Sequence, residues 1–267
     1  MVRTLDQRRM IITGASSGIG RCLAQEAVKI GCRVILASRS AEKLEEVTRQ
    51  LTQVGGEALA VTADITSPAD RQRLMQVAAE HFGGLDVLIN NAGVGSFGHF
   101  SGSTEAVLRQ VMEVNFFAPA ELMRLALPLL RQGEQPAIVN VSSMCGRRGL
   151  PAWPEYSASK FALCGLSEAL RAEFARFDID VLVVLPGMTN TGINLHLLRN
   201  EGRMKLDFTQ GMAAENVAQS ILHALQRNRS ETVLGTEARW ILRINRFFPG
   251  LVSRLMARKV GKLYAHS

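Results

Sequence analysis

The stretch that decides the fold reads Met10-Ile11-Ile12-Thr13-Gly14-Ala15-Ser16-Ser17-Gly18-Ile19-Gly20, an apolar run followed by three glycines spaced G-x-x-x-G-x-G. Apolar residues then recur at helical spacing up to Ile30. A strand, a glycine turn and a helix in this order are typical of a phosphate site. Glycine lets the backbone approach a pyrophosphate, and the helix N-terminus offers free N–H groups to the anion. The alternative is a tight strand-to-helix turn with no ligand.

The apolar run at 33–38 comes next and ends at Ser38 and Arg39. In a dinucleotide site the end of this strand meets the adenosine ribose, where an acid binds the 2′-hydroxyl and an arginine accommodates a 2′-phosphate. No acid lies between Gly31 and Ala41, and Arg21 adds a second cation after the glycine turn. We therefore predict that NADP(H) is preferred over NAD(H). The alternative is that both arginines are solvated surface charges.

Apolar strand patterns and helical patterns alternate along the rest of the chain. This alternation predicts a parallel sheet with helices on both faces. A chain of 267 residues that is 47% hydrophobic is large enough for one such domain. The predicted fold is a single doubly wound α/β domain of the Rossmann type over residues 1–237, with about seven strands. Strands are expected at 9–13, 33–38, 58–62, 85–90, 137–141, 179–185 and 231–235, and further helices at 41–53, 68–82, 104–130, 157–176 and 214–227.

Tyr156 is one of only two tyrosines, and it stands four residues before Lys160 and thirteen after Ser143. On a helix, residues four apart lie on one face. A free phenol titrates near pH 10, but a nearby cation favours the phenolate and lowers its pKa. Such a pair would be a general acid and base that works near neutral pH. A Tyr-x-x-x-Lys pattern also occurs by chance, so it counts only together with the other motifs.

With these pieces placed, the chain resembles the short-chain dehydrogenase/reductase family over roughly residues 8 to 235. The resemblance implies an NAD(P)-dependent oxidoreductase that acts on CH–OH or C=O groups. Each motif is modest alone, but the ordered set is specific. It is carried, in the family's order, by Thr13–Gly20, Asp64, Asn90–Gly93, Asn115, Ser143, Tyr156, Lys160, Pro186, Gly187 and Thr191.

The resemblance implies a role for each residue of a catalytic set. Tyr156 would donate the proton to a carbonyl oxygen in reduction and act as the base in oxidation. Ser143 would hold the same oxygen by a hydrogen bond, with Ser142 as the competing serine. Lys160 would lower the Tyr156 pKa and bind the nicotinamide ribose. Asn115 would help to hold a water that supplies protons, unless it is a buried polar residue of a helix.

The glycine turn and the resemblance together predict the cofactor site. Asp64 resembles a residue that contacts the adenine, and Thr191 would contact the nicotinamide carboxamide. Asn90 and Asn91 could also be plain turn residues. The predicted cofactor-binding residues are Gly14, Ser16, Ser17, Gly18, Ile19, Gly20, Arg39, Asp64, Ile65, Asn91, Ala92, Gly93, Tyr156, Lys160, Pro186, Gly187, Thr189 and Thr191.

The substrate segment is expected at 188–198, because ligands of such folds bind at the carboxyl ends of the strands. Its expected walls offer no arginine clamp for a phosphate or carboxylate, which indicates a lipophilic ketone, aldehyde or secondary alcohol. The alternatives are a soluble 3-oxoacyl thioester reductase and, in another class, a non-catalytic NADP-binding regulatory or scaffold protein. The expected substrate residues are Ser143, Tyr156, Val94, Phe97, Met144, Trp153 and Met188, with His99 as a further wall.

The net charge comes from the C-terminal extension 238–267, which we do not expect to be an independent domain. Seven of the 31 basic residues and none of the 24 acidic ones lie there, and they account for the net charge of +7. Pro249 and Gly250 divide it into two amphipathic helical runs with apolar residues opposite the basic ones. This pattern is typical of a helix at a membrane surface. The alternatives are packing on the domain as a lid over the cleft, or contact between subunits. The extension is too apolar for a nucleic-acid-binding arm.

Other partners and the location of the protein follow from what the sequence lacks. The four cysteines and five histidines have no metal-site spacing, so we predict no metal. Neither a signal peptide nor a membrane span is visible, which predicts a cytoplasmic protein with its extension free to attach to the inner face of a membrane. The resemblance further implies a homodimer or homotetramer formed through the helices near 104–130 and 157–176.

Overall fold

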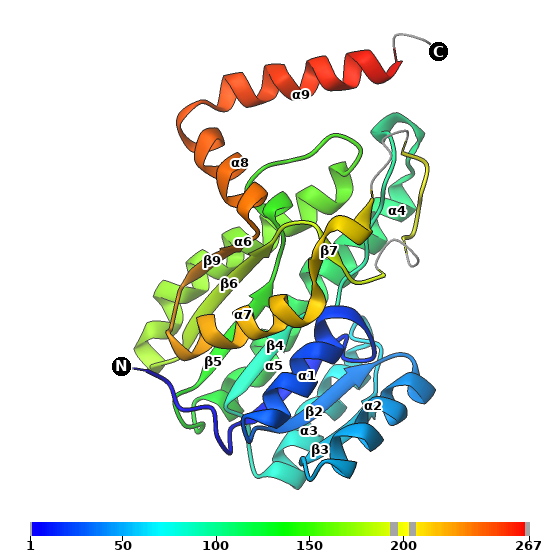
Figure 1. Cartoon of the computed structure of the whole chain (residues 1–267). Coiled ribbons are helices and arrows are strands. Elements are labelled where there is room, and N and C mark those ends of the chain that lie inside the picture. Colours follow the sequence, from blue (N-terminus) through cyan, green and yellow to red (C-terminus); the bar gives the residue numbers. More distant parts are fainter. Residues whose placement is uncertain (1, 193–196, 203–206, 265–267) are drawn as a thin grey trace.

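The computed structural model describes residues 2–192, 197–202 and 207–264. Within these residues one seven-stranded sheet has the order β3-β2-β1-β4-β5-β6-β9, and every neighbouring pair is parallel. The predicted doubly wound Rossmann-type fold is thus confirmed (Figure 1). The strands are β1 (Arg9–Thr13), β2 (Arg33–Ser38), β3 (Ala58–Thr62), β4 (Val87–Asn90), β5 (Ala137–Val141), β6 (Asp180–Pro186) and β9 (Glu231–Leu234).

The chain reverses its direction across the sheet between β1 and β4. From β1 it winds outward through β2 and β3, and from β4 it winds the other way through β5, β6 and β9. Ligands of open α/β sheets bind at the carboxyl ends of the strands at such a reversal. The register places Thr13 beside Ala37, and Ile12 beside Ile89. The loops that follow β1, β2 and β4 therefore meet at one edge of the sheet.

Helices bury both faces of the sheet, as the near-continuous apolar strands predict. Alternate residues of β1 point to opposite faces, so Met10 and Ile12 belong to one core cluster and Ile11 to the other. All three are fully buried. The first cluster is closed by α1 (Gly18–Lys29), α2 (Ala41–Gln53) and α7 (Ala214–Gln226), and the second by α3 (Pro68–Phe82), α5 (Ala118–Leu130) and α6 (Pro154–Phe174).

The single helix predicted for 104–130 is interrupted in the structure. It consists of α4 (Glu105–Met112), a π-helical turn at Glu113–Phe117, and α5. Pro119 explains the interruption, because a proline lacks the N–H for the bond to the carbonyl four residues earlier and its ring clashes with that carbonyl. That carbonyl belongs to Asn115. The predicted catalytic residue thus lies in a π-turn, a feature often found at functional sites.

The helix around Tyr156 begins earlier than predicted. The expected range was 157–176, whereas α6 spans Pro154–Phe174 and a short 3₁₀ turn covers Ala175–Phe177. Proline is favoured in the first turn of a helix, where its missing N–H costs nothing, so Pro154 was the overlooked signal. The earlier start places Tyr156 within the first turn of α6 and fixes its position relative to Lys160.

Several short elements lie in segments that the periodicity left as loops. The strands β7 (Thr189–Asn190) and β8 (Met212–Ala213) pair with each other beside the expected substrate segment. Their pairing brings the segment that follows β6 next to the start of α7. Short 3₁₀ turns span Phe100–Gly102, Met144–Gly146 and Phe208–Gln210.

The C-terminal extension forms two helices, α8 (Thr236–Phe247) and α9 (Pro249–Tyr264). Figure 1 shows α8 leaving the sheet after β9 and α9 lying across the top of the molecule. The break predicted at Pro249 is present, and that proline begins the second helix. Ala238 and Val252 are the buried apolar side chains among the described residues of the two helices. No helix in the described part of the chain is long and apolar enough to cross a membrane.

Candidate active site

The glycine turn after β1 adopts a backbone that two of its three glycines make possible. Gly14 and Gly18 have φ values of +67° and +52°, in the left-handed region that other residues rarely adopt. Gly20 has a different task, because a Cβ atom there would lie 2.2 Å from the carbonyl oxygen of Gly14. Gly20, which we expected at the cofactor, therefore lets α1 pack closely on the turn and does not line the cleft.

The first turn of α1 has the properties of an anion site. Its N-cap is Ser17, whose side chain makes no capping hydrogen bond, and no acidic residue lies in the first turn. The first N–H groups of a helix have no partners within it, and the helix dipole favours an anion there. The residues present thus fit the pyrophosphate of a dinucleotide.

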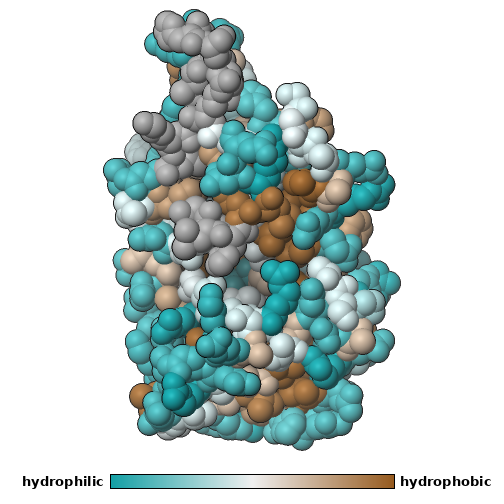
Figure 2. All heavy atoms as spheres, turned by 90° about the vertical axis from the view of Figure 1, so that its right-hand side faces the viewer, coloured by the Kyte–Doolittle hydropathy of each residue, from teal (hydrophilic) through white to brown (hydrophobic). Residues whose placement is uncertain are grey.

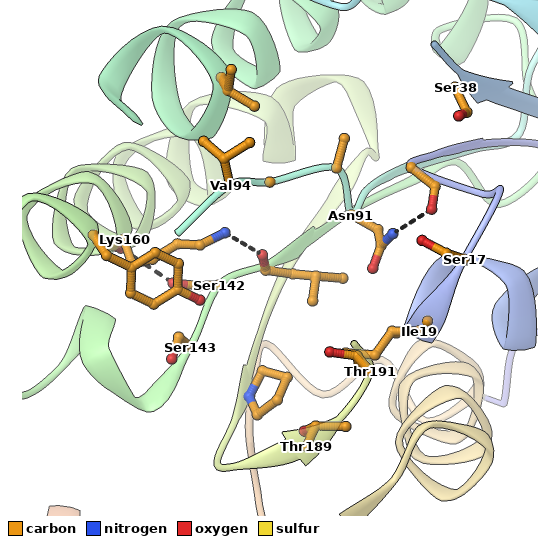
Figure 3. Close-up of a pocket in the computed structure, with 18 of the residues that line it drawn as sticks. Ser17, Ile19, Ser38, Asn91, Val94, Ser142, Ser143, Lys160, Thr189 and Thr191 are labelled. Carbon is orange, nitrogen blue, oxygen red and sulfur yellow. Dashed lines mark hydrogen bonds between the residues drawn. The ribbon is translucent and has the colours of Figure 1, made fainter. Parts of the chain in front are cut away.

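A cleft of about 530 Å³ opens at the carboxyl ends of the strands. Figure 3 shows it extending from Ser38, at the end of β2, to Ser143 and Lys160 at the other end. The structure brings together every predicted cofactor residue except Gly20. Those that line the cleft are Gly14, Ser16, Ser17, Gly18, Ile19, Arg39, Asp64, Ile65, Asn91, Ala92, Gly93, Tyr156, Lys160, Pro186, Gly187, Thr189 and Thr191.

The Ser38 end of the cleft carries two cations. Arg39 lines it, and so does Lys43 from the first turn of α2, a residue that the sequence analysis missed. The four-residue spacing of the two cations was the available signal. Asp64 also lines this end. Burial raises the pKa of this carboxyl, but hydrogen bonds from Thr66 and the charge of Arg39 outweigh it, so the pKa is lowered and the carboxylate persists.

Arg21, the other cation weighed for the same role, faces elsewhere. Its guanidinium donates a hydrogen bond of 3.1 Å to the side-chain oxygen of Gln50 on α2. It is not among the residues that line the cleft. The tertiary structure therefore separates two arginines that were equivalent in the sequence.

At the other end of the cleft, Tyr156, Ser143 and Lys160 converge. Ser143 and Tyr156 both line this end, and the Ser143 hydroxyl accepts a hydrogen bond of 3.1 Å from the backbone N–H of Cys145. The ammonium of Lys160 lies 5.7 Å from the centre of the phenol ring and donates a hydrogen bond of 3.1 Å to the carbonyl oxygen of Val141. Trp153 packs edge-on against Tyr156, with 5.5 Å between the ring centres. The hydroxyl that can donate a proton thus stands beside a second hydroxyl and a cation.

Burial sets the pKa values of this pair. It raises the pKa of Tyr156 well above the ordinary value of 10, and the Ser143 hydrogen bond only partly opposes it. Burial also lowers the pKa of Lys160 from 10.5 to about 8. The expected lowering of the Tyr156 pKa by Lys160 is therefore not observed in the protein alone, where burial of the phenol is the largest influence and raises the pKa. The phenol stays protonated at neutral pH, as an acid must.

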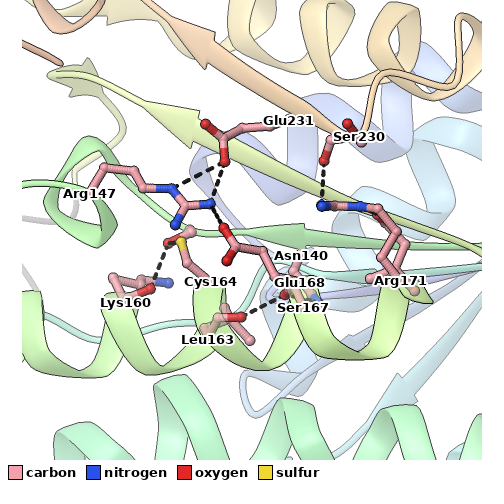
Figure 4. A network of polar contacts seen from close by, with 12 residues as sticks. Asn140, Arg147, Lys160, Leu163, Cys164, Ser167, Glu168, Arg171, Ser230 and Glu231 are labelled. Atoms are coloured by element: carbon pink, nitrogen blue, oxygen red, sulfur yellow. Dashed lines mark hydrogen bonds and ion pairs between the residues drawn. The ribbon is translucent and has the colours of Figure 1, made fainter. Parts of the chain in front are cut away.

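The structure also distinguishes Ser143 from Ser142. The Ser142 hydroxyl donates to the backbone carbonyl of Lys160 at 3.2 Å and accepts from the thiol of Cys164 at 3.3 Å. The Ser142 hydroxyl is thereby bonded to the backbone and a thiol of α6, whereas the Ser143 hydroxyl is the one that lowers the pKa of the phenol. Figure 4 shows the surrounding contacts, in which Arg147 joins Glu231 of β9 and Glu168 of α6. These bonds fix α6, and with it Lys160, against the sheet.

Asn115 lies outside the cleft lining and holds two neighbouring segments in place. Its side-chain oxygen accepts from the backbone N–H of Val94, and its amide donates to the Val94 carbonyl, each at 2.9 Å. The same amide donates to the Ser159 hydroxyl on α6 at 3.0 Å. A Cβ atom on Gly93 would lie 3.1 Å from the Asn115 oxygen and 3.5 Å from the Lys160 nitrogen. Asn115 therefore stands next to Lys160 and orders the loop that lines the cleft.

Most of the expected substrate walls lie at the reactive end. Val94, Met144, Trp153 and Met188 line the cleft there. Phe97 instead packs behind Trp153, with 5.0 Å between the ring centres. Leu198, at the end of the expected substrate segment, also lines the cleft, and the residues that sequence reasoning missed there are Leu150 and Phe208.

One expected wall residue lies elsewhere, and part of the expected substrate segment is not described. His99 does not line the cleft, and its carbonyl accepts a hydrogen bond of 2.7 Å from Arg199. Part of the expected substrate segment, residues 193–196, lies outside the residues that the structure describes. Figure 2 shows apolar side chains gathered in the upper half of the face on which α4 lies.

Comparison with known proteins gives a family match over most of the chain. A family model for short chain dehydrogenases matches residues 8–202. The dehydrogenase/reductase SDR family member 7B of Bos taurus is 34% identical over 264 residues, which make up 95% of this chain and 81% of that protein. These matches cover the glycine turn, the catalytic set and, in the bovine protein, nearly all of the chain.

Solved structures agree with the fold and differ in the dinucleotide they hold. A short chain dehydrogenase/reductase from Burkholderia phymatum in complex with NAD has a TM-score of 0.85 and 27% identity, covering 93% of this chain and 96% of that one. A short chain dehydrogenase from Burkholderia cenocepacia J2315 in complex with NADP has a TM-score of 0.81 and 26% identity, covering 95% and 99%. The choice between the two dinucleotides must therefore be argued from this chain's own residues.

Proposed function

Because the chain belongs to the short-chain dehydrogenase/reductase family, and so is an NAD(P)-dependent oxidoreductase, we propose that it reduces the ketone or aldehyde group of a lipophilic substrate with NADPH. The observation that carries this proposal is the convergence of Tyr156, Ser143 and Lys160 at the apolar end of the cleft. A protonated phenol beside a second hydroxyl is suited to a carbonyl oxygen that gains a proton.

The chain's own residues supply positioning and protons. The bound nicotinamide dinucleotide supplies the hydride, as such cofactors do in oxidoreductases generally. Ser143 donates a hydrogen bond to the carbonyl oxygen and stabilises the charge that develops on it. Tyr156 donates its proton to the same oxygen. Lys160, whose lowered pKa of about 8 leaves it mostly protonated at pH 7, replaces that proton. Asn115 acts as a positioning residue for Lys160 and Val94.

The preference for NADPH is supported by the charges at the Ser38 end of the cleft. Arg39 and Lys43 are the cations that line it, and a 2′-phosphate placed there would be bound by charge-assisted hydrogen bonds. No carboxylate follows β2 to bind a 2′-hydroxyl in the way that NAD-binding sites of this fold do.

Replacing Arg39 by alanine tests this preference. We expect Arg39→Ala to weaken NADPH binding by about 10- to 100-fold, the effect of about 1.5–3 kcal/mol for a hydrogen bond to a charged group. NADH binding should change by less than about twofold, since NADH has no 2′-phosphate. Arg21→Ala is the matched control and should leave both affinities unchanged. Equal losses for the two dinucleotides, measured by titration calorimetry, would refute the assignment.

The substrate proposed is lipophilic because the walls near Tyr156 are apolar. Val94, Met144, Leu150, Trp153 and Met188 surround the reactive end. Among the residues that the structure describes, the lining of the cleft includes no arginine or lysine at this end other than Lys160. A phosphorylated or acidic substrate would therefore lose its hydration there without gaining a partner.

The direct test is the loss of NADPH or NADH absorbance with a panel of lipophilic ketones and aldehydes, and the gain of absorbance with the matching alcohols. We expect turnover with NADPH. Short-chain 3-oxoacyl thioesters belong in the panel, since activity restricted to them would favour the thioester reductase. Tight NADPH binding without turnover of any carbonyl, in the presence and absence of lipid vesicles, would favour a non-catalytic NADP-binding protein.

We also propose that the extension attaches a cytoplasmic enzyme to the inner face of a membrane. The side chains of Trp240, Ile244 and Phe247 recur along one side of α8 and are 58%, 41% and 71% exposed. The guanidinium groups of Arg243 and Arg246 lie about 6 Å from the rings of Trp240 and Phe247, so cations and apolar rings share one surface. Such a surface suits anionic headgroups above an apolar layer.

The assembly we propose is a homodimer or homotetramer through α4, α5 and α6. The phenyl ring of Phe117, between α4 and α5, is half exposed, and large apolar side chains on a flat helical surface favour association.

A further inference from the structure

A groove runs between α9 and the segment that links Ser143 to α6, outside the cleft already described. One wall consists of Leu150, Pro151, Pro154 and Phe161, and the opposite wall includes Met256 and Ala257 of α9. Figure 1 shows α9 passing over this region at a distance from the body of the molecule. The groove is thus a space that exists only because the extension folds back over the domain.

One arginine holds the groove in shape. The guanidinium of Arg148 donates to the side-chain oxygen of Asn245 on α8 at 3.1 Å and to the hydroxyl of Ser253 on α9 at 2.9 Å. It also approaches the sulfur of Met256 at 3.7 Å. Arg148 lies five residues after Ser143. The extension is therefore fixed directly to the loop that carries a predicted catalytic residue.

The groove and the active-site cleft adjoin each other. Leu150 lines both of them. Its backbone is held by the start of α6, where its carbonyl accepts from the N–H of Trp153 at 3.1 Å. Trp153 in turn packs against Tyr156. A molecule whose reacting carbon lies at Tyr156 would therefore have to pass only Leu150 to reach the groove on the side of α9.

The volume of the cleft gives a reason for such an exit. Its roughly 530 Å³ must hold the dinucleotide and the reacting group together. Binding sites for a single drug-sized ligand already measure about 300–1,000 Å³. A long substrate therefore has to extend beyond the cleft, and the groove is the apolar space that adjoins the reactive end.

The chemistry of the groove selects an apolar occupant. Among the described residues, most of its lining side chains are hydrocarbon and none is acidic. The single charged residue among them is Arg148, which is already bonded to α8 and α9. We propose that this groove holds the apolar tail of the carbonyl substrate, so that the enzyme acts on long-chain lipid ketones or aldehydes. This inference rests on the proposed function, whose site it extends, and it makes α9 a wall of the substrate site.

The test compares two fluorescent ketones that share one head group, 6-propionyl- and 6-dodecanoyl-2-(dimethylamino)naphthalene, on the full-length protein without vesicles. Each methylene that leaves water can contribute up to about fourfold in affinity. We expect the dodecanoyl ketone to bind the wild type at least about 30-fold more tightly than the propionyl ketone. NADPH-dependent kcat/KM for 2-alkanones of increasing length should rise in parallel.

Two variants block the groove from α9, where the side chain of Ala257 is exposed and a change does not disturb the core. Ala257→Trp fills it with bulk and Ala257→Asp places a charge in it. The chain-length gain is the ratio by which the dodecanoyl ketone binds more tightly than the propionyl ketone. Both variants should reduce this gain below about threefold and leave the affinity for the propionyl ketone unchanged. Gly261→Trp and Gly261→Asp are matched controls on the same helix, since a side chain at Gly261 meets open space. They should behave as the wild type.

A chain-length gain that persists in both Ala257 variants would overturn the inference, even with normal turnover of short ketones. A change in oligomeric state by light scattering, without loss of the gain, would also overturn it and assign the groove to a second copy of the chain. If no carbonyl is reduced but the gain in binding and its loss in the Ala257 variants are both observed, the proposed function fails and the groove stands as an apolar ligand site.

Discussion

Tyr156→Phe should lower kcat/KM for carbonyl reduction by about 10³- to 10⁴-fold, toward the upper end of what general acid catalysis contributes. The substitution removes one hydroxyl and keeps the ring, so the contact with Trp153 and the shape of the cleft are preserved. NADPH should bind within about threefold of the wild-type affinity, since a single hydrogen bond contributes about 0.5–1.5 kcal/mol. Stopped-flow absorbance for turnover and calorimetry for binding separate the two effects.

The chain supplies its own matched control for this variant. Tyr264, the only other tyrosine, lies at the end of α9, and Tyr264→Phe makes the same chemical change in another element. It should leave turnover unchanged. Tyr156→Phe with more than a tenth of the wild-type turnover would contradict the assignment and point to another acid, with Lys160 as the nearest candidate. Loss of turnover together with loss of NADPH binding would indicate a structural role instead.

Removal of three cations from α8 should weaken binding to anionic vesicles by about 100-fold, because each basic residue at such a surface contributes about 1 kcal/mol. The variant is Arg239→Gln, Arg243→Gln and Arg246→Gln combined. Truncation of the extension is a poorer test, since Arg148 ties it to the domain. Exposed Trp240 is one of only two tryptophans, and the other, Trp153, is buried. A blue shift of Trp240 fluorescence on titration with vesicles therefore measures binding directly.

A control variant that loses the same charge elsewhere distinguishes binding through α8 from a general attraction of the basic protein to anionic vesicles. Arg109, Arg124 and Arg176 are exposed on α4, α5 and the turn after α6, so their triple glutamine variant has the same net charge. It should bind vesicles within about threefold of the wild type, because exposed charges farther than about 10 Å from the membrane are screened. Equal losses in both triple variants would contradict the proposal. Absence of vesicle binding by the wild type, with self-association lost in Trp240→Ser, would identify α8 as a subunit contact.

Sequence patterns predicted the sheet well because its strands are buried on both faces. Short apolar runs between amphipathic helices have few other stable arrangements, and the strands at 9–13, 33–38, 58–62 and 137–141 match their predicted ranges. The ranges of the helices were predicted less well where a proline lies in the first turn of a helix or within the predicted range. Pro154 marks an earlier start of α6, because proline is favoured in the first turn of a helix. Pro119 interrupts the helix predicted for 104–130 with a π-turn, because it cannot donate a hydrogen bond to the carbonyl four residues earlier. A periodic apolar pattern does not record that effect.

The candidate cofactor site was largely predictable for a related reason. Its residues follow strands, and parallel strands of a doubly wound sheet end at one edge, so the loops that carry Gly14, Arg39, Asn91 and Thr189 must meet. Lys43 was missed because it lies past the end of β2, in the first turn of α2, and only its four-residue spacing from Arg39 marks it. Leu150 and Phe208 were missed because irregular segments of the chain contribute them.

The sequence by itself determined the sheet, the glycine turn, the Tyr156–Lys160 spacing and the charge of the extension, because each depends on residues within a few positions of one another. Only the tertiary structure decided the properties that depend on distant segments. It placed Arg39 in the cleft and Arg21 outside it, bonded the Ser142 hydroxyl to the backbone of α6, and folded α9 over the loop after Ser143. It also showed that desolvation governs the pKa values of Tyr156 and Lys160, since burial is imposed by all the elements packed around a group.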